Sequence, residues 1–215
     1  MNKLHIKAME LGWVATNVYI VYNEDTKECV IIDPAAKAEK IEAFIDEEGL
    51  KPVAILLTHA HADHMLALDE IRDRYKVKAY LGEHDADLIE NSEYNAGKYL
   101  FRKDIKTKAD VLLKDGEKLE LLGHVFEVIE TPGHTHGSVC YLVRDEDIIF
   151  TGDTLFRNSY GRYDLYSGDF EALKTSLRDK IFILDDKIIV YPGHMSISTL
   201  EYEKKNNPIV KDSGQ

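Results

Sequence analysis

Apolar stretches with two different periods follow one another along the first half of the chain, and they predict strands and helices in turn. Residues 16–22 alternate and are rich in β-branched and aromatic side chains, so together with 29–33 they predict a hairpin. Residues 38–48 show helical spacing and stop at Gly49, which predicts a helix that ends there. The apolar run 53–58 is typical of a strand buried on both faces.

The rest of the chain repeats this order. Residues 66–75 predict a helix and 76–82 a strand, whereas the weak periodicity of 84–110 predicts a helix with a loop. Strands followed by helices, twice over, predict an α+β protein with two sheets and helices outside them. Further strands are expected at 118–123, 124–130, 138–144, 147–152 and 187–191.

Two helix starts can be placed from their capping residues. A helix over 168–180 has Ser167 or Asp169 as its expected N-cap. Ser198 and Glu201 have the spacing of a capping box, which predicts a terminal helix beginning there.

Composition and charge narrow the class of protein. The 215 residues are 44% hydrophobic and 31% charged, so we expect one globular domain spanning 1–215. The net charge of −12 disfavours nucleic acid as a partner. No long apolar window and no N-terminal apolar block is present, so we expect no membrane span and a cytoplasmic location. Cys29 and Cys140 lie in apolar strands and are interpreted as buried thiols.

Residue types that bind metals follow four of the predicted strands. Because neighbouring strand ends lie about 5 Å apart, these side chains can converge on one spot. Histidine and carboxylate without thiolate suit Zn, Fe(II) or Mn(II), and seven candidates are too many for one tetrahedral ion. They suit two ions about 3.5–4 Å apart. The candidates are His59, His61, Asp63 and His64 in "THAHADH", His134 in "TPGHTHGS", Asp153 in "FTGDTLF" and His194 in "YPGH".

These ordered motifs resemble those of the metallo-β-lactamase superfamily, over essentially the whole chain. "GRYDLYSGD" at 161–169 and "PGHMSISTLEYEKKNNP" are most similar to short bacterial glyoxalase II-like hydrolases. The resemblance implies a four-layer αβ/βα sandwich with two divalent metal ions, zinc first and iron or manganese as alternatives. It implies that the C-terminal helical domain with which full glyoxalase II binds glutathione is missing. It also implies a division of ligands: His59, His61 and His134 for one ion, Asp63, His64 and His194 for the other, with Asp153 bridging.

The same resemblance implies hydrolysis of a small-molecule thioester, of the hydroxyacylglutathione hydrolase type. A hydroxide bridging the two ions would attack the carbonyl carbon, and Asp63 would orient it and take its proton. Asp33, Arg162 and Asp164 are expected to support the metal ligands. His136 is not expected to be a ligand. A basic stretch could hold a carboxylated thiol or be a solvated helix face: Lys98, Arg102, Lys103, Lys106 and Lys108.

Two other functions stay open at this point. A persulfide dioxygenase with a single iron shares the fold and the "THxHADH" phrase, but such enzymes usually carry Cys where this chain has Tyr160. The other alternative is a metal-binding protein without catalytic activity. The sequence leaves the acyl group, the thiol and the oligomeric state undetermined.

Overall fold

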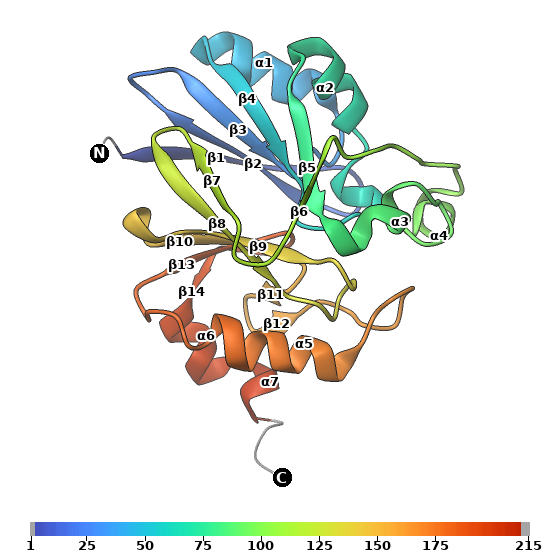
Figure 1. Ribbon diagram of the computed structural model, residues 1–215, viewed down its shortest axis with the longest axis vertical. Helices are drawn as coiled ribbons and strands as arrows, with labels where there is room; N and C mark the ends of the chain where they lie inside the picture. Colours follow the sequence, from blue (N-terminus) through green and yellow to red (C-terminus); the bar gives the residue numbers. More distant parts are fainter. Residues whose placement is uncertain (1–2, 212–215) are drawn as a thin grey trace.

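Two mixed sheets packed face to face form the centre of the molecule (Figure 1). The computed structural model describes residues 3–211. Within them, the first sheet has the order β1–β2–β3–β4–β5–β6: Leu4–Leu11, Thr16–Asn23, Glu28–Ile32, Lys51–Leu56, Lys78–Gly82 and Val111–Leu113. The second has the order β14–β13–β10–β9–β8–β7: Ser198–Thr199, Ile189–Pro192, Ile148–Gly152, Val139–Val143, His124–Glu130 and Lys118–Leu121. A small ribbon pairs β11 (Leu155–Phe156) with β12 (Ser159–Tyr160).

Helices cover the outer face of each sheet, which completes the expected four-layer αβ/βα sandwich (Figure 1). Helices α1 and α2 lie on the first sheet, and α5, α6 and α7 lie on the second. Within residues 3–211, no helix has the length and apolarity needed to cross a bilayer. The helices are α1 (Ala38–Glu48), α2 (Leu68–Tyr75), α3 (Ala86–Ile89), α4 (Gly97–Phe101), α5 (Phe170–Ser176), α6 (Leu200–Asn206) and α7 (Pro208–Lys211), and α5 continues into a π-helical turn at Leu177–Ile181.

Apolar layers between these elements hold the sandwich together. Tyr141, Phe126 and Phe150 are completely buried between the two sheets. Ile41 of α1 and Leu173 of α5 are buried where these helices pack on the first and the second sheet. Each such side chain contributes about 1.5–3 kcal/mol when it is removed from water. This packing fixes the positions of the strands, and with them the positions of the loops that follow.

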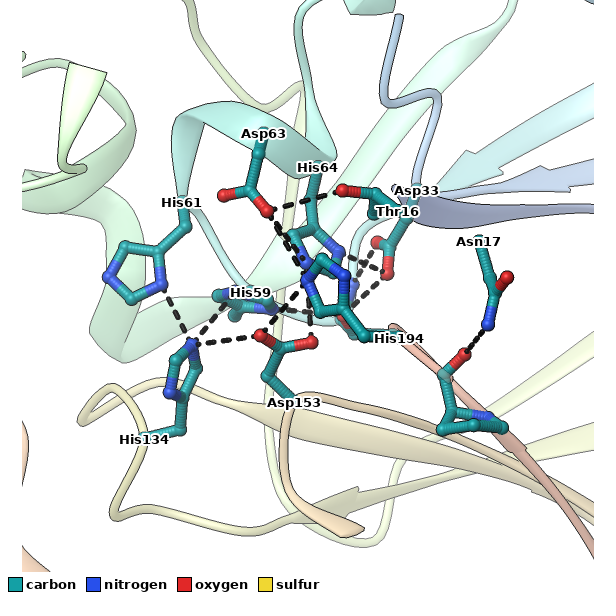
Figure 2. Close-up of polar contacts among 12 residues, drawn as sticks. Thr16, Asn17, Asp33, His59, His61, Asp63, His64, His134, Asp153 and His194 are labelled. Carbon is teal, nitrogen blue, oxygen red and sulfur yellow. Dashed lines mark hydrogen bonds and ion pairs between the residues drawn. The ribbon is translucent and has the colours of Figure 1, made fainter. Parts of the chain in front are cut away.

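The strand directions bring four loops to one edge of the sandwich. In the second sheet, β8 and β10 are both antiparallel to β9, and β13 is parallel to β10. Hence β8, β10 and β13 all point the same way, and the loops after them start at the same edge. The loop after β4 of the first sheet meets them there (Figure 2). The convergence expected from the sequence is present.

Within residues 3–211, five strands were not expected from the sequence: β1, β6 and the two-residue strands β11, β12 and β14. β1 pairs with β2 along its whole length, from Leu4 opposite Asn23 to Leu11 opposite Thr16. Most of its side chains are exposed or part-exposed, and its sequence has no continuous apolar run. β6 is short and directly follows the region 84–110 of weak periodicity, where α3 and α4 were expected only as a helix with a loop.

One of the two expected helix caps is confirmed and the other is wrong. Asp169 caps α5, since its carboxylate accepts a hydrogen bond from the amide of Ala172 at 3.0 Å. At α6 the cap is Thr199, whose hydroxyl accepts from the amide of Tyr202. Ser198 lies one residue earlier in β14 and donates instead to the buried carboxylate of Glu203. Strand pairing therefore moves the helix start one residue past the expected cap.

Candidate metal centre

The seven predicted side chains lie together at the edge where β4, β8, β10 and β13 end (Figure 2). The loop after β4 carries the first four of them, and its short 3₁₀ turn, Ala62–His64, contains two of these four. The other three come from loops of the second sheet. The group consists of His59, His61, Asp63, His64, His134, Asp153 and His194, and its ligand-type atoms form overlapping sets within 4.8 Å of one another.

Three histidines form the first set. The Nε2 atom of His134 lies 2.8 Å from Nδ1 of His61 and 3.2 Å from Nε2 of His59. Ligand atoms of a tetrahedral zinc ion, at about 2.0–2.1 Å from the metal, stand about 3.3 Å from one another. The spacing of the three ring nitrogens therefore fits a shared cation.

A carboxylate and two histidines form the second set. The Oδ2 atom of Asp63 lies 3.3 Å from Nε2 of His194 and 3.6 Å from Nε2 of His64. The hydroxyl of Thr16 donates to the same oxygen at 3.2 Å. The other oxygen of Asp63 is left for another partner.

Asp153 lies between the two sets. Its Oδ2 atom is 3.5 Å from Nε2 of His134 in the first set and 3.4 Å from Nε2 of His194 in the second. Its Oδ1 atom is 3.3 Å from Nε2 of His64. One carboxylate thus touches histidines of both sets.

Outward hydrogen bonds fix which ring nitrogen faces the centre in four of these histidines. Nδ1 of His134 donates to the carbonyl of Arg162 at 2.7 Å, and Nδ1 of His194 donates to the carbonyl of Ala15 at 3.2 Å. Because these partners can only accept, Nδ1 carries a proton and Nε2 is the nitrogen that faces the centre.

The other two histidines are held through Asp33 and Thr58. Nδ1 of His64 donates to Oδ2 of Asp33 at 2.9 Å. The backbone amide and hydroxyl of Thr58 both donate to the same carboxylate at 2.7 Å. The Thr58 oxygen is then free to accept from Nδ1 of His59 at 3.1 Å. Asp33 therefore orients His64 directly and His59 through Thr58. Unlike Asp33, Thr58 was not a candidate from the sequence.

The polar atoms of the centre fit a bound cation. Within residues 3–211, the buried atoms His64 Nε2 and Asp153 Oδ1, which face each other at the centre, have no hydrogen-bond partner. A buried polar atom without a partner costs about 1–3 kcal/mol. Imidazole lone pairs and carboxylate oxygens are the donor set that Zn, Fe(II) and Mn(II) accept.

The two sets differ in their protonation. Burial lowers the pKa of His59 well below its ordinary value, and neighbouring His64 and His134 add to this. Burial and His134 lower the pKa of His61 to about 3. Both rings are therefore neutral, the form that binds a metal.

Carboxylates reverse the shift in the second set. Burial opposes the charged form of His194, but Asp153 and Asp63 outweigh it and raise its pKa to about 10. Burial likewise opposes the charged form of Asp63, yet His64 and His194 lower the pKa of this carboxyl to about 2. The carboxylates thus favour positive charge at this position, as a metal ion would supply.

Three glycines next to these loops allow backbones to approach closely. A Cβ on Gly193 would lie 2.3 Å from Asp153 Oδ1, and one on Gly161 would lie 1.8 Å from the carbonyl oxygen of Asp153. Gly152 has a positive φ of 47°, and a Cβ there would lie 2.2 Å from the hydroxyl oxygen of Thr58. Any side chain at these positions would push the ligand loops apart.

Arg162 and Asp164 lie at the same centre but act differently from each other. The carbonyl of Arg162 orients His134, as described above. Its guanidinium donates two hydrogen bonds to Asp164, at 2.7 and 2.9 Å. This pairing lowers the pKa of the Asp164 carboxyl to about 2. Among the hydrogen bonds of residues 3–211, the Asp164 carboxylate therefore accepts from the Arg162 side chain and from none of the seven candidate residues.

A cavity of about 610 Å³ opens over the centre. His61, Asp63, His134, Asp153 and His194 form its floor, and its walls are mainly apolar. From the stretch 98–108, the described lining of the cavity includes Leu100 and none of the five basic residues. Lys98 pairs instead with Glu93, and Lys106 with Asp104.

Known proteins with similar sequences point to one family. The sequence model described as "Metallo-beta-lactamase superfamily" matches residues 11–194. "Probable metallo-hydrolase YqgX" of Bacillus subtilis is 36% identical over 205 residues, which are 95% of this chain and 96% of that protein. "Hydroxyacylglutathione hydrolase GloC" of Haemophilus influenzae is 35% identical over 189 residues, 87% of this chain and 89% of that protein.

Solved structures show the same fold. BLEG-1 B3 metallo-beta-lactamase superposes with a TM-score of 0.92 at 39% identity, covering 96% of this chain and 99% of that one. A di-iron-bound form of TTHA1623 gives 0.84 at 35% identity, covering 94% and 98%. ETHE1 from Myxococcus xanthus gives 0.80 at 28% identity, covering 96% and 85%.

Proposed function

This chain belongs to the metallo-beta-lactamase superfamily, and from that premise we propose that it is a metal-dependent hydrolase of thioesters, of the hydroxyacyl-thiol type. The observation that carries the proposal is the pair of ligand sets joined by Asp153 at the floor of an open cavity. The likeness to GloC supports the substrate class.

We propose that the two sets hold two divalent ions, zinc first and iron or manganese as alternatives. Asp153 would contact both ions. Such ions supply an ionised water molecule at neutral pH and polarise the carbonyl group that is attacked. The likeness to TTHA1623 in its di-iron-bound form supports two sites without selecting the metal. The proposed ligands are His59, His61 and His134 for one ion, and Asp63, His64 and His194 for the other.

Asp63 is proposed as the residue that orients the attacking water and takes its proton. Its low pKa keeps it ionised at neutral pH. Thr16 occupies Oδ2, so Oδ1 is the oxygen available to accept the proton. The side chain also lines the cavity in which a substrate would lie. This position at the cavity, with one carboxylate oxygen facing away from Thr16, supports the role.

The test is a panel of thioesters that includes S-lactoylglutathione, with metal content measured on the same sample. We expect turnover that disappears after chelation and returns with added metal. Asp63→Asn should lower kcat by about 100-fold or more even when excess metal fills the site that Asp63 helps to form. Asp179→Asn, on an exposed carboxylate paired with Arg178, is the matched control and should behave as wild type. A metal-loaded protein that hydrolyses no thioester would overturn the proposal.

A persulfide dioxygenase with one iron is the second candidate. The fold likeness to ETHE1 supports keeping it. Oxygen uptake with glutathione persulfide, measured on the iron-loaded protein, separates it from the hydrolase. Uptake without thioester turnover would favour the dioxygenase. Metal binding without either activity would favour a non-catalytic metal-binding protein.

We also propose one domain over residues 1–215, because loops of both sheets supply the same centre. Residues 1–2 and 212–215 lie outside the described part of the chain. The cytoplasm stays a prediction from the sequence.

A further inference from the structure

A buried carboxylate outside the seven proposed ligands connects two of their loops. Asp85 ends the short 3₁₀ turn Glu83–Asp85 that follows β5, and none of its surface is exposed. An ionised group in such a position is costly unless hydrogen bonds satisfy it. Its partners therefore show what it does.

All three hydrogen-bond donors to Asp85 come from loops that carry proposed ligands. The amide of Ala60, between His59 and His61, donates to Oδ2 at 2.9 Å. The hydroxyl of Thr135, next to His134, donates to the same oxygen at 2.8 Å. The amide of Gly137 donates to Oδ1 at 2.8 Å. The first loop follows β4 of one sheet and the second follows β8 of the other.

The backbones around this carboxylate are packed without spare room. A Cβ on Gly137 would lie 2.2 Å from the amide nitrogen of Asp85, and one on Gly82 would lie 2.3 Å from the carbonyl oxygen of Gly137. The hydroxyl of Ser138 lies 2.7 Å from that of Thr135 and donates to it, since the Thr135 proton is used on Asp85. The link between the loops is therefore rigid.

Asp33 offers a comparison at the same centre. It contacts His64 of the second set directly and His59 of the first set through Thr58. Asp85, in contrast, has no described hydrogen bond to Asp63, His64 or His194, within residues 3–211. One buried carboxylate thus serves both sets, whereas the other serves the three-histidine set.

We propose that Asp85 is the positioning residue of the three-histidine set, because it ties the His59–His61 loop to the His134 loop at the separation that a shared metal ion requires. The proposal rests on the proposed metal-binding function, but not on the substrate. It concerns metal affinity, so it can be tested without any turnover.

Asp85→Asn is the most informative change. Two amides and one hydroxyl donate to the carboxylate of Asp85. Asparagine would replace one of its two acceptor oxygens with an NH₂ group, which is itself a donor. The Ala60 or Gly137 amide would then face an NH₂ group, and the two loops would separate. Loss of a partner that orients metal ligands typically costs about 10- to 100-fold in metal affinity.

The experiment measures Zn²⁺ and Co²⁺ affinity of the full chain by competition with a chelator. In a His194→Ala background, which disables the second set, Asp85→Asn should weaken the remaining site about 10- to 100-fold and change the Co²⁺ visible spectrum. In a His134→Ala background, it should change the remaining site by less than about threefold. Equal losses in both backgrounds, or no loss in either, would overturn the proposal.

Two further variants keep the test informative if Asp85→Asn folds poorly. Thr135→Val removes one donor to Asp85 at almost constant volume and should weaken the same site, while Thr135→Ser should restore it. Asp179→Asn is the matched control, since this exposed carboxylate pairs with Arg178 instead. Wild-type affinity in Thr135→Val would contradict the proposal.

If thioester turnover is absent but the selective loss of metal affinity is found, the proposed function fails and the role of Asp85 stands. If thioester turnover is present but the loss of metal affinity is not selective, the proposed function stands and the role of Asp85 fails. The two outcomes are therefore distinguishable on one set of proteins.

Discussion

His61 differs from the other four histidines of the centre in the ring nitrogen that faces inward. Its Nδ1 atom lies 2.8 Å from His134, and its Nε2 atom is buried without a partner within residues 3–211. The others present Nε2 because their Nδ1 atoms donate outward. Spacing in the sequence identifies a histidine as a candidate, but its tautomer depends on partners that are distant in the chain.

At this scale we predict that both cysteines are inert in the native protein. Burial raises the pKa of Cys29 to about 12 and that of Cys140 to about 11. A raised pKa leaves less thiolate, and at pH 8 roughly a thousandth of Cys140 would be ionised. Ellman's reagent should therefore find no reactive thiol before unfolding and two after it. Rapid reaction of the native protein would contradict this.

A second residue prediction concerns Gly161. Gly161→Ala would force a Cβ against the carbonyl of Asp153 and within 3.1 Å of Nδ1 of His134. We expect a loss of metal affinity of at least tenfold, measured by competition with a chelator. Gly116→Ala is the control: nothing lies within 4 Å of its Cβ, and its positive φ should cost stability without changing metal affinity.

At the scale of elements, helix α5 supports the loop that carries His134. Its cap, Asp169, donates its own amide to the carbonyl of Gly133 at 2.8 Å. A Cβ on Gly133 would lie 2.3 Å from the backbone of Leu173 in the helix. The end of β8 and the start of α5 are thus packed directly against each other, which explains a glycine one residue before a proposed ligand.

We therefore predict that Asp169→Ala lowers the free energy of unfolding by about 0.5–2 kcal/mol, the usual cost of losing an N-cap. Urea denaturation of the metal-free protein measures it. Asp169→Asn keeps an oxygen that can accept from Ala172 and should retain most of the stability. An alanine variant as stable as wild type would show that the helix start does not depend on this cap.

At the scale of the whole molecule, both sheets contribute to one centre. The loop after β4 belongs to the first sheet, and the loops of His134, Asp153 and His194 belong to the second. Bound metal would therefore link the two halves and would be present only in the folded state. Ligands that bind only the folded state stabilise it in proportion to the logarithm of their concentration.

Metal removal should consequently lower the melting temperature. At free metal a thousand times its Kd, the stabilisation is about 4 kcal/mol. For a chain of this size, that corresponds to roughly 10 °C. Calorimetry before and after chelation, with metal added back, measures the shift. His134→Ala, which lacks a proposed ligand, should show a smaller shift, and an unchanged wild-type melting temperature would contradict the prediction.

The sequence by itself determined the candidate residues and the architecture. His59, His134, Asp153 and His194 each follow an apolar strand, so local periodicity was enough to place them at strand ends. It could not reveal β1, whose part-exposed side chains carry little signal, or the move of the α6 cap to Thr199.

Only the tertiary structure decided how the candidates are held. Asp85 and Gly137 are separated by 52 positions in the chain, and Asp33 and His64 by 31. Local patterns report which face of an element is buried and where the chain turns. Contacts between loops depend instead on how the strands pair and how the two sheets pack, because only these bring such distant donors and acceptors within hydrogen-bond distance.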